Sequence, residues 1–455
     1  MKKLLAILLA VVMIVMVGAC GTKNNGGTTT PNSPGGSNEE PGTPAPGGES
    51  DTLTGELDIW AWGADDEATA RKDAIEVFIK NHPNLKVTYT VIPTADQVWD
   101  QKSSAALASG SAGDVMQMSP DWYGMNTKYY IDLNPLVQRD GIDLDAVITP
   151  GLIDRYYDAD GKLEGLPLHT NCFVIAYNKD MFAEAGVPEP KEGWTLQDLA
   201  DWGKAFAKGS GANQTYAMAK HWCMNNFMIY SMGGIPYTED LSTPKMGTEE
   251  IVKALGLYKE LLDNGIIPTD TAQKTIPAQT LFTSGKAAMY TMGGFEAAQV
   301  IRDAEENGIN LGFAPMPSDP NGKEINVQYA TGWAITTTAK NVDAAWAFLK
   351  ESSFANDEMG TINARVGIPA NRKIAESVYA QTKIGNVEFT NNYYVQHISN
   401  AHMNPFGGTL ASSGNIWTTM VEEVTLNGQD PAAVVAKYAP QIEAEFASYE
   451  FNAKK

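Results

Sequence analysis

Cysteine and basic residues are both scarce in this chain of 455 residues. Three cysteines are too few for a disulfide scaffold, and 33 Lys and Arg against 54 Asp and Glu give a formal net charge of −21. Because an acidic chain without a Lys/Arg cluster repels the phosphate backbone, we expect no nucleic-acid partner. The length and the 43% hydrophobic composition predict about two to three globular domains.

Common catalytic and metal-binding motifs are also missing. The sequence has no Gly-x-x-x-x-Gly-Lys-Ser/Thr phosphate loop, no His-Glu-x-x-His and no Gly-x-Ser-x-Gly. Residues 158–161 (Asp-Ala-Asp-Gly) hint at a calcium loop, but Tyr156 and Pro167 stand where acidic ligands are needed, so a hairpin turn is the better interpretation. His397 and His402 are wrongly spaced for one helix face. We therefore expect no enzymatic activity, no cofactor and no metal.

Long apolar runs are absent except at the N-terminus. Lys2 and Lys3 precede an apolar run from Leu4 to Val17, which Gly-Ala-Cys20 follows. This pattern is typical of a secretory signal and too short for a mature membrane span. Val-Gly-Ala-Cys resembles the bacterial lipoprotein box, in which the cysteine becomes the first mature residue and carries lipid; the alternative is an ordinary signal peptide with an incidental cysteine. Removal of residues 1–19 would change the net charge to −23, since two lysines are lost.

The segment after Cys20 has almost nothing with which to build a core. Residues 21–51 are mostly Gly, Pro, Ser, Thr and Asn, and their largest apolar residue is Ala45. Such a composition does not fold, and a flexible coil of this length reaches about 30 Å. The sequence therefore predicts a lipidated cysteine and disordered tether over residues 20–51. The protein would be held on the extracytoplasmic side of the cell membrane by its lipid, with the folded body beginning near Thr52.

Strand and helix patterns alternate after Thr52, which predicts an α/β fold containing a parallel sheet. Thr195 and Asp198 predict a capping box, and Gly265 predicts a helix end. The predicted strands are 56–62, 85–93, 114–118, 173–177, 287–292 and 333–338, and the predicted helices are 68–81, 95–109, 195–207, 248–264, 342–351 and 431–448.

Three motifs in order resemble those of the family 1 extracellular solute-binding proteins, the lipoprotein receptors of ABC importers for sugars and oligosaccharides. They are Pro167–Glu184 with its Tyr177-Asn178, Phe282–Met289 with its Gly-Lys and Ala-Met, and Thr331–Ile335 followed by the segment 345–349. His169 and Ala176 depart from the usual residues. After the second motif, where the family commonly has Trp close behind Gly, this chain has Phe295 and Glu296.

The resemblance implies a two-lobe, type II periplasmic-binding-protein-like fold with discontinuous lobes, a hinge and a ligand cleft between the lobes. Chain crossings are expected near 167–170, 284–286 and 329–332. The lobes would then comprise 52–168 plus 286–329, and 169–285 plus 330–455. The implied function is capture of a mono- or oligosaccharide by hinge closure and its delivery to the permease subunits. The protein is expected to be a monomer.

The site residues are sought where strands end, because open parallel sheets bind ligands beyond the carboxyl ends of their strands. Trp beside Asp suits a sugar, since flat rings pack on C–H faces and carboxylates accept from hydroxyls. The candidates at the first and third strand ends are Trp62, Asp65, Asp66, Asp121 and Trp122, although either Asp65 or Asp66 could instead cap a helix. The candidates placed by the resemblance or its motifs are Asn171, Trp222, Asn225, Glu296, Trp333, Arg365 and Trp417.

Alternatives stay open for several of these residues. Arg365 could bind hydroxyls or a carboxylate, or could form a surface salt bridge. Cys172 and Cys223 are interpreted as buried free thiols, with a disulfide as the alternative. For the whole chain, the alternatives are a receptor for a solute other than sugar and a surface-anchored carbohydrate-active enzyme with paired carboxylates.

Overall fold

The computed structural model describes residues 53–63, 65–93, 98–120, 127–158, 160–236, 245–403 and 411–447. The predicted signal peptide, Cys20, the tether, Asp121 and Trp122 lie outside the described residues, and so does the side chain of Asp65. Within these ranges, no helix combines the length and the apolar character that a bilayer crossing needs.

The first sheet combines early and late segments of the chain. Its parallel part is β1 (Gly55–Trp62), β2 (Leu85–Ile92) and β3 (Val115–Met118), connected by α1 (Asp65–Asn81) and α2 (Val98–Ser109), as the sequence predicted. The strand order is β10-β4-β9-β3-β1-β2, with β11 paired to β9. The late strands are β4 (Leu166–Asn171), β9 (Asn326–Ile335), β10 (Ile368–Pro369) and β11 (Ala401–Met403).

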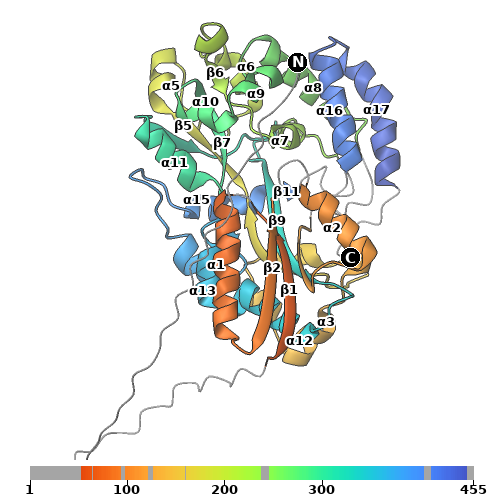
Figure 1. The fold of residues 1–455 in the computed structure, drawn as a ribbon. Helices are drawn as coiled ribbons and strands as arrows, with labels where there is room; N and C mark the ends of the chain where they lie inside the picture. Colours follow the sequence, from red (N-terminus) through yellow and green to blue (C-terminus); the bar gives the residue numbers. More distant parts are fainter. Residues whose placement is uncertain are drawn as a thin grey trace, which may run out of the picture. The chain divides into compact units, whose positions relative to one another are not determined.

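We call this sheet and its helices the first lobe. In Figure 1, α1 lies alongside β1 and β2. The apolar side of the sheet packs against helices from both ends of the chain, because α1 contacts α13 and the core contains residues of α12. Besides α1 and α2, the helices of this lobe are α3 (Asn134–Asp140), α4 (Leu144–Val147), α12 (Val342–Lys350) and α13 (Asp357–Asn363), with short turns at Thr127–Tyr129, Ile153–Tyr156 and Glu351–Ala355.

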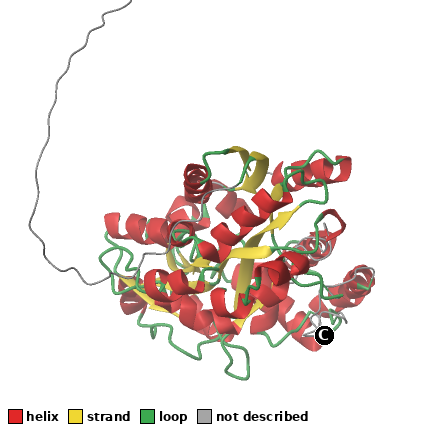
Figure 2. Cartoon of the chain, turned by 90° about the horizontal axis from the view of Figure 1, so that it is seen from below, coloured by secondary structure: helices red, strands yellow, loops and turns green. Residues whose placement is uncertain are grey.

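The second sheet, with its helices, forms the second lobe. Its order is β6-β7-β5-β8, formed by β5 (Phe173–Asn178), β6 (Tyr216–Met218), β7 (Ala287–Gly293) and β8 (Leu311–Ala314). All six side chains of β5 are buried, and the first five alternate between two cores: Phe173, Ile175 and Tyr177 in one, Val174 and Ala176 in the other. Helices therefore cover both faces of this sheet. Figure 2 shows helices around the strands of the folded body.

The helices of the second lobe fall into two groups. The Phe173 face packs against α5 (Lys179–Ala185), α6 (Leu196–Gly203), α7 (Met224–Ser231), α8 (Glu249–Asp263), α16 (Ala411–Thr425) and α17 (Pro431–Phe446). The Val174 face packs against α10 (Ala278–Thr283), α11 (Ala297–Glu306), α14 (Arg372–Ile374) and α15 (Asn392–His397). In Figure 1, α16 and α17 lie beside α8, and they contact it. The remaining elements are α9 (Asp270–Thr275) and short turns at Gly211–Asn213, Ala375–Tyr379 and Ile398–Asn400.

The strand pairing corrects the expected division of the chain. Residues 286–329 were expected in the first lobe, but β7 and β8 within this range pair with β5 in the second sheet. Residues from 330 onward were expected in the second lobe; α16 and α17 pack there, but β9 pairs with β3 and β4 in the first. The crossing expected at 284–286 is wrong, because α10 before it and β7 after it pack together. An apolar run such as that of β7 predicts a buried strand but carries no information about its partner.

Local signals were more reliable than pairing. The predicted capping box is present, with Thr195 Oγ1 accepting from the Asp198 N–H at 3.1 Å and Asp198 Oδ2 accepting from the Thr195 N–H at 2.8 Å. Gly265 follows α8 with a φ of 63°. Cys172 and Cys223 are buried free thiols, as expected.

Asn326 joins the two segments that pass between the sheets. Phe173 opens β5 directly after β4, and Asn326 opens β9 after β8. The fully buried Asn326 side chain accepts from the Phe173 N–H at 3.0 Å and donates to the Phe173 carbonyl at 2.7 Å. The amide thereby imitates a peptide group and ties the two crossing segments together.

Candidate functional site

A cluster of aromatic rings lies where the crossing segments meet. Phe173 is fully buried and contacts three rings edge-on: Trp222 at 6.1 Å, Phe295 at 6.3 Å and Tyr329 at 5.7 Å between centroids. We call these four residues the aromatic wall. They come from the start of β5, the turn before α7, the turn after β7 and the middle of β9, so no short motif contains them.

Trp222 is the exposed member of the aromatic wall. Its side chain is 58% exposed, while Phe295 and Tyr329 are half-buried. Its ring packs on Tyr329 at 4.9 Å. A large apolar side chain that is exposed on top of other rings offers a flat surface to a ligand, since folding alone would bury it.

Polar groups border the aromatic wall. Asn226 donates to the Tyr329 hydroxyl at 2.6 Å and so fixes that ring. The neighbouring Asn225 is half-buried, and its amide has no hydrogen-bond partner within the described part of the chain. Asn225 and Trp222, both predicted, are three residues apart in the chain, in the first turn of α7 and in the turn before it, and they offer a donor, an acceptor and a flat ring.

The Asn171 side chain is enclosed between the lobes. It is 5% exposed and donates to the Val366 carbonyl at 3.0 Å. A Cβ added to Gly294 would lie 2.7 Å from Asn171 Oδ1, and one added to Gly367 would lie 2.7 Å from its Nδ2. The glycines thus allow two backbone segments to approach this amide closely, and Asn171 acts first as a junction residue.

In the first lobe, Trp62 ends β1 and packs on Trp99 at 5.3 Å. Trp62 is 7% exposed, and its backbone N–H donates to Gln117 Oε1 at 3.0 Å. Gln117 is fully buried, and its Nε2 has no partner among the described residues. Asp66 is exposed in the first turn of α1. These groups lie at the carboxyl ends of β1 and β3, where a ligand is expected.

A buried ionic cluster that sequence reasoning missed supports the start of α1. Arg71 is 1% exposed, donates to Glu67 Oε1 at 3.2 Å and contacts His169 Nε2. Burial, aided by the Arg71 cation, holds the pKa of His169 well below its usual range, so the ring is neutral and accepts from Arg71. Burial raises the pKa of Glu67, and Arg71 opposes that shift. The Glu67 side chain is 27% exposed and is the solvent-accessible acceptor of the cluster.

Three predicted site residues are placed elsewhere. Trp333 is 1% exposed in the first-lobe core, where its Nε1 donates to Ser352 at 2.8 Å. Trp417 is 2% exposed in the second-lobe core. Arg365 is exposed and forms a 2.7 Å ion pair with Asp73, the surface salt bridge that was its alternative. The predictions for Trp333 and Trp417 are wrong, because β9 lies inside the first sheet and α16 packs between helices.

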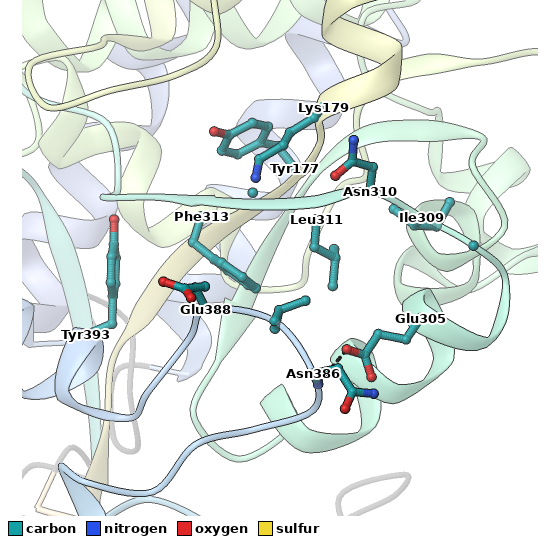
Figure 3. Close-up of a pocket in the computed structure, with 13 residues that line it drawn as sticks. Tyr177, Lys179, Glu305, Ile309, Asn310, Leu311, Phe313, Asn386, Glu388 and Tyr393 are labelled. Atoms are coloured by element: carbon teal, nitrogen blue, oxygen red, sulfur yellow. Dashed lines mark hydrogen bonds between the residues drawn. The ribbon is translucent and has the colours of Figure 1, made fainter.

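A separate groove of about 700 Å³ lies on the second lobe and shares no residue with the aromatic wall (Figure 3). Residues 308–313, which are the turn before β8 and its first three residues, line it without a gap. Successive side chains of a strand point to opposite faces of its sheet, so a groove that meets every residue must run along the strand edge. The groove therefore follows the edge of β8, which ends the sheet order. In Figure 3, the opposite wall carries Asn386, whose N–H donates to Glu305 at 2.7 Å, and Glu388.

Two α/β lobes, joined by crossing segments and carrying an exposed Trp beside the crossing, define a two-lobe binding-protein fold. The chain belongs to the bacterial extracellular solute-binding proteins, whose family model matches residues 61–351. Members of this family are binding proteins rather than enzymes.

Individual relatives agree with this assignment. The maltooligosaccharide ABC transporter solute-binding lipoprotein of Streptococcus pneumoniae is 28% identical over 326 residues, covering 69% of this chain and 72% of that protein. Two solved structures share the fold. They are an ABC substrate-binding protein from Listeria monocytogenes in complex with cycloalternan (TM-score 0.73, 19% identity, 86% of this chain and 99% of that one) and the GacH receptor of Streptomyces glaucescens, solved unliganded and with acarbose (TM-score 0.72, 21% identity, 87% and 100%).

Proposed function

We propose that this protein is the receptor of an ABC importer that captures an oligosaccharide against the aromatic wall and delivers it to its permease. The observation that carries the proposal is the 58% exposed Trp222 on a base of three further rings. A sugar packs its C–H face on such a ring and pairs its hydroxyls with neighbouring amides and carboxylates. The relatives named above bind or transport saccharides by their descriptions.

We assign roles on this basis. Trp222 is the stacking platform, and Asn225 is a hydrogen-bonding partner beside it. In the first lobe, Trp62, Asp66 and the accessible carboxylate of Glu67 supply the ligand contacts. Asp65, Asp121 and Trp122, which the sequence places at the same strand ends, are retained as candidates.

The same proposal covers the location of the protein. We infer that Cys20 carries lipid and that residues 20–51 tether a monomeric receptor to the outer side of the cell membrane. Palmitate labelling of cells that express the protein tests the anchor: the wild type should be labelled and Cys20→Ala should not. Labelling of the Cys20→Ala variant would contradict it.

Calorimetric titration of the purified protein with linear and cyclic α-glucans and with galactooligosaccharides tests the ligand class. Trp222→Ala should weaken binding by about 2 kcal/mol, or about 30-fold in Kd, as for a buried interface aromatic. Leu426→Ala is the matched control, because Leu426 is also exposed (72%) but lies outside the aromatic wall. Binding of peptides or polyamines and of no saccharide would refute the ligand class, and a cleaved saccharide would favour an enzyme.

A further inference from the structure

Glu296 is occupied by protein donors. Its Oε2 accepts from the Tyr290 hydroxyl at 2.8 Å, and its Oε1 accepts from the Gly293 N–H at 3.0 Å and lies 3.2 Å from His221 Nε2. The side chain is only 16% exposed. A carboxylate with two internal hydrogen bonds and an imidazole nitrogen at ion-pair distance has little capacity left for a ligand hydroxyl. The direct binding role expected from its sequence position is therefore not favoured.

The hydrogen bonds determine which nitrogen of His221 carries the proton. Nδ1 accepts from the Cys223 N–H at 3.3 Å and lies 2.8 Å from Cys223 Sγ. Burial raises the pKa of the Cys223 thiol, and the Glu296 carboxylate acts in the same direction, so the thiol is protonated and donates. With Nδ1 accepting, the proton is on Nε2 and faces Glu296. Cys223 thus donates to His221, and the Nε2 side of the ring faces the Glu296 carboxylate at 3.2 Å.

His221 in turn supports the exposed Trp222. The imidazole is 3% exposed, and its centroid lies 5.0 Å from the Trp222 ring and 5.4 Å from Phe173. Because most of Trp222 is exposed, burial does not fix its orientation; its ring contacts are with His221, Phe173 and Tyr329. The two chain neighbours of Trp222, His221 and Cys223, are both held by the same hydrogen-bonded chain.

We propose that Glu296 is a positioning residue, which orients the Trp222 platform through its 3.2 Å contact with Nε2 of His221. The inference rests on the proposed function only in taking Trp222 as a surface that binds ligand. The coupling between Glu296 and Trp222 does not require a ligand. It also assigns a role to a carboxylate that lies 74 positions away from Trp222 in the sequence.

The test is the near-ultraviolet circular dichroism of Trp222 in the ligand-free protein. The Trp222 signal is the difference between a protein and its own Trp222→Ala version. We expect Glu296→Ala to lower this signal at least twofold. Glu296→Gln should retain it, because its carbonyl oxygen still accepts from His221. Tyr290→Phe, which removes only the donor to Oε2, is the control and should also retain it.

An unchanged Trp222 signal in Glu296→Ala, or an equal loss in Tyr290→Phe, would overturn the proposal. If Glu296→Ala does not fold, His221→Phe is the deciding variant, because it keeps a ring but removes Nε2–H. It must lose the Trp222 signal.

Maltotriose affinity provides a second readout. Glu296→Ala should weaken binding about 10-fold in the wild-type background and less than 2-fold in Trp222→Ala, while equal weakening in both would contradict a role through Trp222. Failure of the wild type to bind any saccharide would count against the proposed function, with the ligand-free spectra still testing Glu296.

Discussion

Replacement of Asn326 should separate the two crossing segments energetically. In Asn326→Ala, three buried backbone groups lose their side-chain partner: the N–H and C=O of Phe173 and the N–H of Val327, which donates to Asn326 Oδ1 at 2.9 Å. Leaving a buried polar group unpaired costs about 1–3 kcal/mol. Since strand neighbours and water relieve part of this, we expect the free energy of unfolding to fall by about 3 kcal/mol.

Asn326→Asp adds a pH dependence of known sign. A carboxylate keeps the two N–H donors but faces the Phe173 carbonyl, so it must be protonated to donate there. Burial and this carbonyl raise its folded-state pKa above the unfolded value of about 3.9. The contribution of the protonated acid is present below the unfolded pKa and is lost as the pH rises through the folded pKa, by about 1.4 kcal/mol for each pH unit between the unfolded and the folded pKa. The variant should therefore approach wild-type stability in acid and lose it toward neutral pH.

Guanidinium chloride unfolding at several pH values measures both effects, with far-ultraviolet circular dichroism and Trp fluorescence required to give the same transition. Asn310→Ala is the control, because Asn310 is exposed and its side-chain amide donates to the exposed Asp180 at 2.8 Å. It should change stability by less than about 0.5 kcal/mol. Equal stability of Asn326→Ala and wild type, or a loss in Asn326→Asp that does not depend on pH, would refute the reasoning.

Two further predictions concern the first lobe. His169 is held neutral in the folded protein, so the unfolded chain binds the proton first as the pH falls below about 6.5, and the free energy of unfolding drops by up to about 1.4 kcal/mol per pH unit. When unfolding is measured at pH 7.5 and 5.5, the free energy of unfolding should fall less in His169→Gln than in the wild type. An equal fall in both would contradict the neutral assignment. Gly332→Ala would place a Cβ 2.4 Å from the Leu166 carbonyl oxygen and should lower the free energy of unfolding by about 1–3 kcal/mol. The control is Gly256→Ala in α8 of the second lobe, where a Cβ meets open space and should raise the free energy of unfolding by about 0.5–1 kcal/mol. The same shift of the melting temperature in both variants would refute the packing argument.

Local patterns in the sequence were sufficient for the elements. The alternation of residues 56–62 and the helix pattern of 68–81 gave β1 and α1, and the order of the motifs gave the two-lobe fold. These local patterns were not sufficient to predict which strands pair with one another. β7 and β9 are both largely buried strands, yet one joins the second sheet and the other the first.

Site residues were predictable from the sequence only where the position of a residue in the chain, such as a turn or a strand end, also determines whether its side chain is exposed. Trp222 and Trp333 are the same residue type, each near a motif, but one is 58% and the other 1% exposed, because only the latter is on a strand with neighbours on both sides. The contacts of Glu296 with His221, and of Arg71 with His169, join residues 75 and 98 positions apart. No local pattern announces such pairs, since they exist only after the sheets have formed.

The position of β9 inside the first sheet has a consequence for biosynthesis. β3 has β1 on one side and, on the other, a strand that begins at Asn326. As the chain is made from its N-terminus, β1, β2 and β3 emerge long before β9, and until then the open edge of β3 is a template for pairing with other chains. The second sheet needs nothing beyond β8, at Ala314, so all its strands are available first. The earliest part of the folded body to be synthesised is thus completed late, and a factor that shields unpaired strand edges would act on it from the synthesis of Met118 until that of Asn326.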